Sequence, residues 1–330
     1  MDPVEPNNPS SQYFRVVYSA RYHIDIGPHV FPTLKYRMVH ARLLESRVVQ
    51  PTDIVEPEPA SWKELGLVHT PEYLTKLRDG TLSSEEIAQL ELPWSHEMVD
   101  GFRLMVGGTI DAACLASGIE RANVTRASGR ACAGAETSET RARVVCHIGG
   151  GLHHAFPSHG EGFCPFNDVA VAARVLQSRG IERVAIVDLD VHHGNGTAFV
   201  FESDQRVFTF SMHQQHNYPM WKPRGSLDIG LPDGVHDATF LEKLERALPS
   251  AMANRPECVF YLAGADPYEG DQLGGLRLTK EGLRARDRMV IQAVQVAGIP
   301  LVIVLAGGYA RNVDDTVAVH AATIEEARRG

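Results

Sequence analysis

Short apolar runs alternate with longer amphipathic stretches along most of the chain, and this alternation limits the possible folds more than any other feature. The apolar runs are rich in β-branched and aromatic residues and span 14–19, 144–148, 183–189, 206–211, 258–264 and 300–308. Such runs predict strands that are buried on both faces. The amphipathic stretches have helical length and span 97–117, 167–179, 237–253 and 279–297. We therefore predict a single-domain α/β fold, with a mostly parallel central sheet and helices on both faces.

Two segments depart from this pattern. Residues 1–12 are polar and proline-rich, and we expect them to form a flexible N-terminal tail. Residues 119–143 are rich in Ala, Ser, Thr, Arg and Gly without an apolar period, which predicts a surface insertion. Residues 13–330 show no internal repeat and no domain boundary, so we expect them to form one domain.

Charge and cysteine content narrow the function classes. The formal net charge of −9 argues against a nucleic-acid-binding surface and suits a cationic substrate, such as a lysine-bearing peptide or a polyamine. No apolar run reaches the roughly 18 residues of a membrane span, and the N-terminus lacks the pattern of a signal peptide. Five cysteines without a CxxC pair favour a reducing cytoplasm. We expect a cytoplasmic protein that binds neither nucleic acid nor membrane, of unknown oligomeric state.

The segment VAIVDLDVHHGNGT (184–197) carries the first indication of a metal site. In an extended chain Asp188, Asp190 and His192 would point the same way, because strand side chains alternate. They lie at the carboxyl end of a predicted parallel strand, where open α/β sheets bind ligands. Two carboxylates and an imidazole would be costly to bring together without a cation. The simpler alternative is that both carboxylates cap the following turn.

A second strand end adds Asp266, within YLAGADPYEGDQLGGL (261–276). Alone, this residue is typical of a turn. Together with Asp190 and His192 it makes a set of two carboxylates and one histidine, which is typical of a catalytic zinc ion with one open position. We therefore predict one Zn²⁺ per chain on these three residues.

A third strand end precedes a histidine pair, within HIGGGLHHAFPSHGEGFCPFND (147–168). The glycines at 149–151 let the backbone approach a ligand closely. His153 and His154 follow, and a neutral imidazole is a suitable general base for activating a metal-bound water. A histidine pair alone is more often a surface or structural feature.

A fourth strand end presents Tyr309, within VLAGGYARN (304–312). Its phenol could donate a hydrogen bond to a carbonyl oxygen as charge develops there. A tyrosine in this position alone usually serves packing. Since four strand ends supply these groups, we expect all of them to face one crevice.

These motifs resemble those of the histone deacetylase superfamily, which has the arginase-type α/β fold. GGGLHHA, GFCPFND, VDLDVHHGNGT, GADPYEGDQLGGL and AGGY occur in the family's order, and YHIDIGPHVFPTLKYRMVH and VHTPEYLTKL resemble its N-terminal segments. The resemblance covers nearly the whole chain apart from the tail and the insertion. HGNG, SMHQQHNYP and SLDIGLPDG are similar to the class IV branch and its bacterial relatives.

The resemblance implies that 13–330 is a deacetylase catalytic domain. Its activity would be zinc-dependent hydrolysis that removes an acetyl or longer acyl group from the side-chain amine of lysine or a lysine-like amine. It implies zinc on Asp190, His192 and Asp266, catalysis by the tandem histidines and Tyr309, and a substrate tunnel bordered by Gly151, Phe163 and Tyr218. It also implies a structural K⁺ or Na⁺, bound partly through main-chain carbonyls, at Asp188, Asp190, His192, Ser211 and Met212.

Two departures from the family pattern matter. Many members orient the second histidine with an aspartate, whereas this chain has Asn195. An amide cannot stabilise an imidazolium as a carboxylate does. His153 would keep the partner Asp188, so we predict that His154 is less basic and acts as the general base. The carboxylate that grips the substrate backbone has no clear counterpart, although Glu97 and Asp100 are candidates.

Three alternatives remain open. A two-manganese ureohydrolase on the same fold would need further bridging carboxylates, but the GADP segment supplies only Asp266. A non-catalytic acyl-lysine binding protein would not need a base and an oxyanion donor. An acetylpolyamine or another small acylated metabolite could replace the lysine substrate, because fold does not determine substrate.

Overall fold

The computed structural model describes residues 13–121 and 143–329. The predicted tail and nearly all of the predicted insertion lie outside these residues. Within them, one eight-stranded sheet has the order β2-β1-β3-β8-β7-β4-β5-β6. Each neighbouring pair is parallel. The strands are β1 (Phe14–Val17), β2 (Ile54–Val55), β3 (Val144–His147), β4 (Val184–Asp188), β5 (Val207–Gln214), β6 (Leu227–Leu231), β7 (Cys258–Leu262) and β8 (Leu301–Val304).

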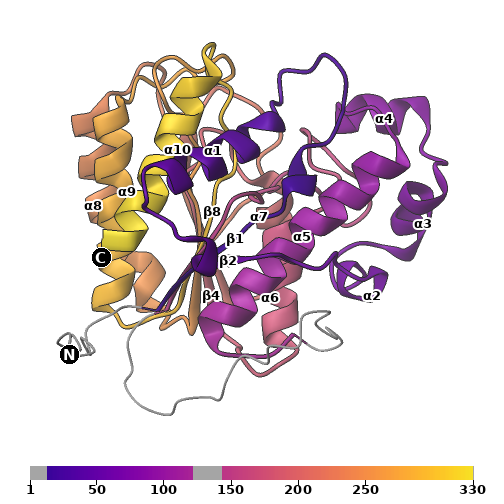
Figure 1. The fold of residues 1–330 in the computed structure, drawn as a ribbon, viewed down its shortest axis with the longest axis horizontal. Coiled ribbons are helices and arrows are strands. Elements are labelled where there is room, and N and C mark those ends of the chain that lie inside the picture. Colours follow the sequence, from indigo (N-terminus) through magenta and orange to yellow (C-terminus); the bar gives the residue numbers. More distant parts are fainter. Residues whose placement is uncertain (1–12, 122–142, 330) are drawn as a thin grey trace, which may run out of the picture.

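Two layers of helices flank the sheet (Figure 1). One layer holds α8 (Asp237–Ala253), α9 (Lys280–Val296) and α10 (Val313–Arg329), with α1 (Leu34–Glu45) packed on α10. The other holds α5 (His96–Ser117), which contacts β1, β3, β7 and β8, and α6 (Asp168–Gln177), which packs on α5. The remaining α-helices are α2 (Trp62–Leu65), α3 (Pro71–Asp79), α4 (Ser84–Leu90) and α7 (Asn195–Phe201). The predicted α/β architecture is confirmed.

The burial of the strands follows from their sequences. Every residue of β3, β4, β7 and β8 is buried, as their uninterrupted apolar runs predict. In β6 the residues alternate between partly buried and exposed, because this strand lies at the edge of the sheet. The sequence analysis missed β6, which contains no continuous apolar run, and β2, which has only two residues.

The four strands that precede the predicted site residues are consecutive neighbours, in the order β3-β8-β7-β4. Their register brings their carboxyl ends to the same level: His147 pairs with Val304, Val304 with Leu262, and Leu262 with Asp188. The loops that follow these residues therefore emerge together at one edge of the sheet. Within 13–121 and 143–329, no helix combines the length and the apolarity that a membrane span requires.

Candidate metal centre and catalytic pocket

The three predicted zinc ligands lie together and are buried. One potential ligand atom from each of Asp190, His192 and Asp266 lies within 4.8 Å of the others. The Nδ1 atom of His192 is 3.1 Å from Oδ1 of Asp190 and 3.4 Å from Oδ2 of Asp266. A donor set of two carboxylates and one imidazole is typical of a catalytic zinc site.

The turn after β4 brings Asp190 and His192 into place. The strand ends at Asp188, so the alternation of an extended chain does not continue through all three residues, and that part of the sequence argument was wrong. Instead, Oδ1 of Asp188 accepts a hydrogen bond from the Asp190 amide at 3.1 Å, and Oδ1 of Asp190 accepts one from the His192 amide at 3.0 Å. Both carboxylates therefore cap the turn, and Asp190 belongs to the buried cluster as well.

The electrostatics of this cluster fit a bound cation. The Oδ2 atom of Asp266 is buried and accepts no hydrogen bond within the described residues. Burial and the nearby charge of Asp190 raise the pKa of Asp266. Burial alone would lower the pKa of His192, but its hydrogen bond to Asp190 and the charges of both aspartates raise it to about 10. In the metal-free protein an imidazolium therefore offsets part of the negative charge, and a divalent cation could replace it.

The histidine pair makes contacts of equal length to two different partners. Nδ1 of His153 is 2.7 Å from Oδ2 of Asp188, and Nδ1 of His154 is 2.7 Å from Oδ1 of Asn195. The two Nε2 atoms are 3.1 Å apart, so one ring can donate to the other. All four residues are buried.

The two histidines differ in basicity. Burial alone would lower the pKa of His153, but the charges of Asp188 and Asp190 outweigh it and raise the pKa to about 9. Burial and the charges of His153 and His192 lower the pKa of His154 well below its usual value. The pair therefore combines a protonated ring with a neutral one.

The glycine run before the histidines allows a close backbone approach. Gly151 has φ +79°, and a Cβ atom there would lie 2.5 Å from the backbone of Ala306 in the loop after β8. Such a conformation and such a contact favour glycine. The buried carboxylate of Asp168 fixes this loop by accepting hydrogen bonds from the amides of Gly151 and Leu152, at 3.0 and 2.7 Å.

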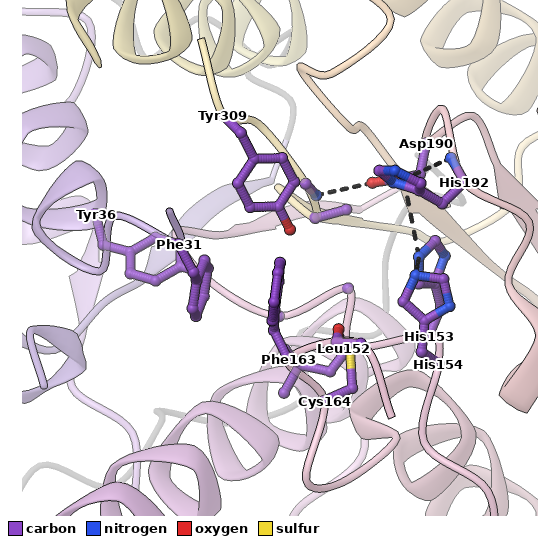
Figure 2. A pocket seen from close by; sticks show the side chains of 15 residues that line it. Phe31, Tyr36, Leu152, His153, His154, Phe163, Cys164, Asp190, His192 and Tyr309 are labelled. Atoms are coloured by element: carbon purple, nitrogen blue, oxygen red, sulfur yellow. Dashed lines mark hydrogen bonds and ion pairs between the residues drawn. The ribbon is translucent and has the colours of Figure 1, made fainter. Parts of the chain in front are cut away.

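A pocket with aromatic walls leads to the cluster (Figure 2). Its labelled side chains are Phe31, Tyr36, Leu152, His153, His154, Phe163, Cys164, Asp190, His192 and Tyr309. Apolar and aromatic groups thus line its walls, and Asp190 and the three histidines gather at one end. This arrangement suits a ligand with an apolar stem and one polar reacting group.

Phe163 and Tyr309 shape the pocket. Phe163 has φ +66°, a strained conformation for an aromatic residue, and its ring stacks on Phe31 with the centroids 6.1 Å apart. The Tyr309 ring meets Phe163 edge-on at 5.9 Å, and Figure 2 shows its hydroxyl directed into the pocket. Burial and the charges of Asp190 and Asp266 raise the pKa of Tyr309, so its phenol stays protonated.

Three other predicted residues, Tyr218, Ser211 and Met212, do not line the pocket. Tyr218 packs edge-on against His154, with the ring centroids 5.0 Å apart, but it does not line the pocket itself. Ser211 is the register partner of Asp188 on β5, and Met212 follows it in the same strand, where both are buried.

The candidate carboxylates for gripping a substrate backbone lie on the first turns of α5. Glu97 and Asp100 are exposed there, and neither lines the pocket. Asp100 forms an ion pair with Arg103 at 2.9 Å.

Sequence reasoning missed four residues that support the pocket. Asp168 holds the glycine loop, and Asp271 accepts a hydrogen bond from the Tyr309 amide at 2.6 Å. Lys35 is buried and donates to the Ala306 carbonyl at 3.0 Å. Glu161 accepts a hydrogen bond from Nδ2 of Asn195 at 2.7 Å. All four lie within segments that the sequence analysis quoted, but no feature of those segments assigned any of them a role.

Comparison with known proteins gives a consistent result. The model of the histone deacetylase domain matches residues 29–324. An uncharacterized protein of Picosynechococcus sp. is 41% identical over 96% of this chain and 98% of its own length. Histone deacetylase 2 of Arabidopsis thaliana is 31% identical over 90% of this chain and 75% of its own length. The acetoin utilization protein AcuC of Staphylococcus aureus is 29% identical over 77% of this chain and 66% of its own length.

Solved structures agree with the fold. The crystal structure of the HDA15 HD domain superimposes with a TM-score of 0.76 and 25% identity, covering 96% of this chain and 88% of that domain. A histone deacetylase homolog complexed with SAHA gives a TM-score of 0.75 at 23% identity, over 96% of this chain and 84% of its own. The family model covers most of the chain, and its matched segment includes the buried cluster, the histidine pair and Tyr309. The chain therefore belongs to the histone deacetylase family.

Proposed function

We propose that this protein is a zinc-dependent hydrolase that removes an acyl group from the side-chain amine of lysine or a lysine-like amine. One observation carries the proposal. One aromatic pocket is lined by Asp190 and His192 of the buried cluster, by both histidines of the pair and by the phenol of Tyr309. A water nucleophile, a base and an oxyanion donor could therefore meet at a single carbonyl group.

In this proposal Asp190, His192 and Asp266 hold the metal through two carboxylates and one imidazole. Bound zinc would polarise the amide carbonyl and lower the pKa of a water molecule. His154 is the general base, because its lowered pKa leaves Nε2 unprotonated at neutral pH. As the water oxygen bonds to the carbonyl carbon, His154 takes the water proton.

Tyr309 acts at the carbonyl oxygen, and His153 belongs to the pair that protonates the leaving nitrogen. The protonated phenol of Tyr309 donates a hydrogen bond to the carbonyl oxygen as negative charge accumulates there. His153 holds a proton at neutral pH, since its pKa is raised to about 9. We assign to the histidine pair the proton that the nitrogen receives when the C–N bond breaks. The products are a carboxylic acid and a free amine.

The pocket walls support a substrate with a methylene stem. Phe31 and Phe163 present ring faces that an alkyl chain can contact without losing hydrogen bonds. The net charge of −9 suits a substrate that carries positive charge elsewhere. The structural K⁺ or Na⁺ beside Asp188 and Ser211 stays a prediction.

The test is amine release from three compounds: an acetyl-lysine peptide, a long-chain acyl-lysine peptide and an acetylated polyamine. Each is incubated with zinc-loaded protein, with and without a chelator. We expect chelator-sensitive turnover of at least one compound, and the preferred compound identifies the substrate class. Absence of turnover of all three would contradict the proposal.

A metal titration tests the ligand assignment independently of turnover. We expect one zinc ion per chain, and two would favour a two-metal hydrolase instead. Asp266→Asn should weaken zinc binding strongly, because it replaces a buried carboxylate that accepts no other hydrogen bond at Oδ2. Asp100→Asn is the matched control, because Asp100 is exposed and lies on α5 away from the cluster. Equal zinc affinity in both variants would refute the assignment.

A further inference from the structure

The carboxylate of Glu161 contacts Asn195 on the side away from His154. Glu161 lies in the loop that connects the histidine pair to α6. Glu161 receives a hydrogen bond from Nδ2 of Asn195 at 2.7 Å and one from the Tyr218 hydroxyl at 3.0 Å, both at Oε1. Its Oε2 atom receives one from Gln89 at 3.3 Å and lies 3.6 Å from Nε2 of His159. The Glu161 side chain is only 15% exposed, so water cannot replace all of these partners.

This carboxylate determines which way the amide of Asn195 points. An ionised carboxylate can only accept hydrogen bonds, so it selects the NH₂ end of the amide. The carbonyl end, Oδ1, then faces His154 and can only accept. Nδ1 of His154 must therefore carry its proton, and Nε2 must present its lone pair.

We propose that Glu161 is a positioning residue that fixes the tautomer of His154 through Asn195. The inference rests on the proposed function, in which His154 takes a proton at Nε2. A single aspartate in direct contact would fix the same tautomer but would also favour an imidazolium. The pair of Asn195 and Glu161 fixes the tautomer while keeping the negative charge one residue further from the ring.

Glu161 also anchors the aromatic residue that packs on this ring. The Tyr218 hydroxyl donates to the same Oε1 atom, and the Tyr218 ring lies edge-on to His154 with an interplanar angle of 88°. One carboxylate thus orients two neighbours of His154, namely Asn195 and Tyr218.

The alternative is that Glu161 only fastens its own loop. The backbone of this loop is already bonded, because the Glu161 and Cys164 amides and carbonyls pair with one another and the Phe163 amide donates to the Leu90 carbonyl. These bonds do not involve the Glu161 side chain. Side-chain variants that keep the size of Glu161 therefore separate the two roles.

The test is a double-mutant cycle in the zinc-loaded enzyme. Glu161→Gln offers an amide that can turn either end toward Asn195, and we expect kcat to fall about tenfold, as for other residues that orient a catalytic group. Asn195→Asp places two carboxylates in contact, and we expect a loss of similar or greater size. The double variant should lose much less activity than the product of the two single losses, because the new glutamine can donate to the new carboxylate, which still accepts from Nδ1 of His154.

If the loss of kcat in the double variant equals the product of the two single losses, the proposal is overturned. That result is expected if Glu161 only holds its own loop in place. Glu91→Gln is the matched control: it is the same chemical change in an exposed glutamate whose side chain does not contact Asn195. We expect it to keep wild-type kcat. Zinc content and thermal midpoint are measured for every variant to confirm that each one folds and binds metal.

The imidazole ¹⁵N chemical shifts of the zinc-loaded protein provide a readout without turnover. We expect the Nδ1–H tautomer for His154 in wild type and a mixture of tautomers in Glu161→Leu, with the signals assigned by their loss in His154→Gln. If no acylated amine is cleaved but the tautomer depends on Glu161, the proposed function fails and this inference stands. If turnover occurs but the tautomer ignores Glu161, the inference fails alone.

Discussion

The two halves of the histidine pair use the same residue type at the same distance from a partner, yet they reach opposite protonation states. His153 contacts Asp188 and His154 contacts Asn195, each at 2.7 Å, and both rings are buried. The accepting group differs, since one is a carboxylate and the other an amide. The comparison teaches that neither distance nor burial distinguishes the two rings, because both are shared, and that the surrounding charges do: Asp188 and Asp190 beside His153, and His153 and His192 beside His154.

Removing the neutral ring should have the largest effect. We expect His154→Ala to reduce kcat about a thousandfold at pH 7, since a positioned general base typically contributes a hundred- to ten-thousandfold. His153→Ala should lose less, on the order of a hundredfold. Rates of single turnover on the preferred acylated amine measure both. A larger loss for His153→Ala would reverse the assignment of the base.

Removing the phenol of Tyr309 should have the next largest effect on kcat. It should leave the protonation states of His153 and His154 unchanged. We expect Tyr309→Phe to lower kcat about a hundred- to a thousandfold, because one oxyanion donor is lost. The pH–rate profile should keep its shape, since the Tyr309 ring is not hydrogen-bonded to either histidine. Zinc content should equal that of wild type. A variant that retains a tenth of the rate would remove Tyr309 from the mechanism.

Replacing the carboxylate beside His153 should abolish the difference between the rings. In Asp188→Asn the pKa of His153 should fall from about 9, because its largest favourable charge is lost. The basic limb of the pH–rate profile should therefore move to lower pH, with a roughly hundredfold lower kcat at pH 8. An unchanged basic limb would show that His153 does not control it.

The same substitution makes a prediction about the stability of metal-free protein. A histidine whose pKa rises on folding stabilises the native state below its unfolded pKa of 6.5, and this contribution is lost as the pH rises through about 9. The thermal midpoint of wild type should therefore decline more steeply between pH 6.5 and 9 than that of Asp188→Asn. Parallel curves for the two proteins would contradict the raised pKa.

The smallest effect should come from the outermost partner of Glu161. His159 lies 3.6 Å from that carboxylate and its side chain is 28% exposed. We expect His159→Gln to change kcat less than threefold, since partly exposed ion pairs contribute little. Steady-state assays at low and high salt check this, and a loss above tenfold would extend the network to the surface.

The strands and the clustering of Asp190, His192 and Asp266 could be predicted from the sequence because each depends on local pattern. Uninterrupted apolar runs identified β3, β4, β7 and β8, and the polar residues after them were expected at one edge of the sheet. Parallel pairing then brings those strand ends together whatever the loops do. The turn after β4 was considered only as an alternative to a metal site, whereas Asp188 and Asp190 form it through hydrogen bonds to backbone amides and Asp190 also joins the buried cluster.

Two supporting residues that act across long sequence separations, Lys35 and Glu161, could not be predicted. Lys35 reaches the Ala306 carbonyl from α1, and Glu161 meets Asn195 from a different loop. Nothing in the residues around either position signals these partners, since a lysine or glutamate in a polar segment is usually exposed. Only the packed arrangement of the loops reveals them.

The position of β8 in the sheet has a consequence for biosynthesis. β8 is the last strand to leave the ribosome, yet it pairs with β3 on one side and β7 on the other. Until residues Leu301–Val304 have been translated, no strand joins β3, which precedes the histidine pair, to β7 and β4, which precede the acidic residues. The nascent chain cannot assemble the complete pocket early, and a truncation shortly before β8 would separate β3 from β7 rather than shorten an edge of the sheet.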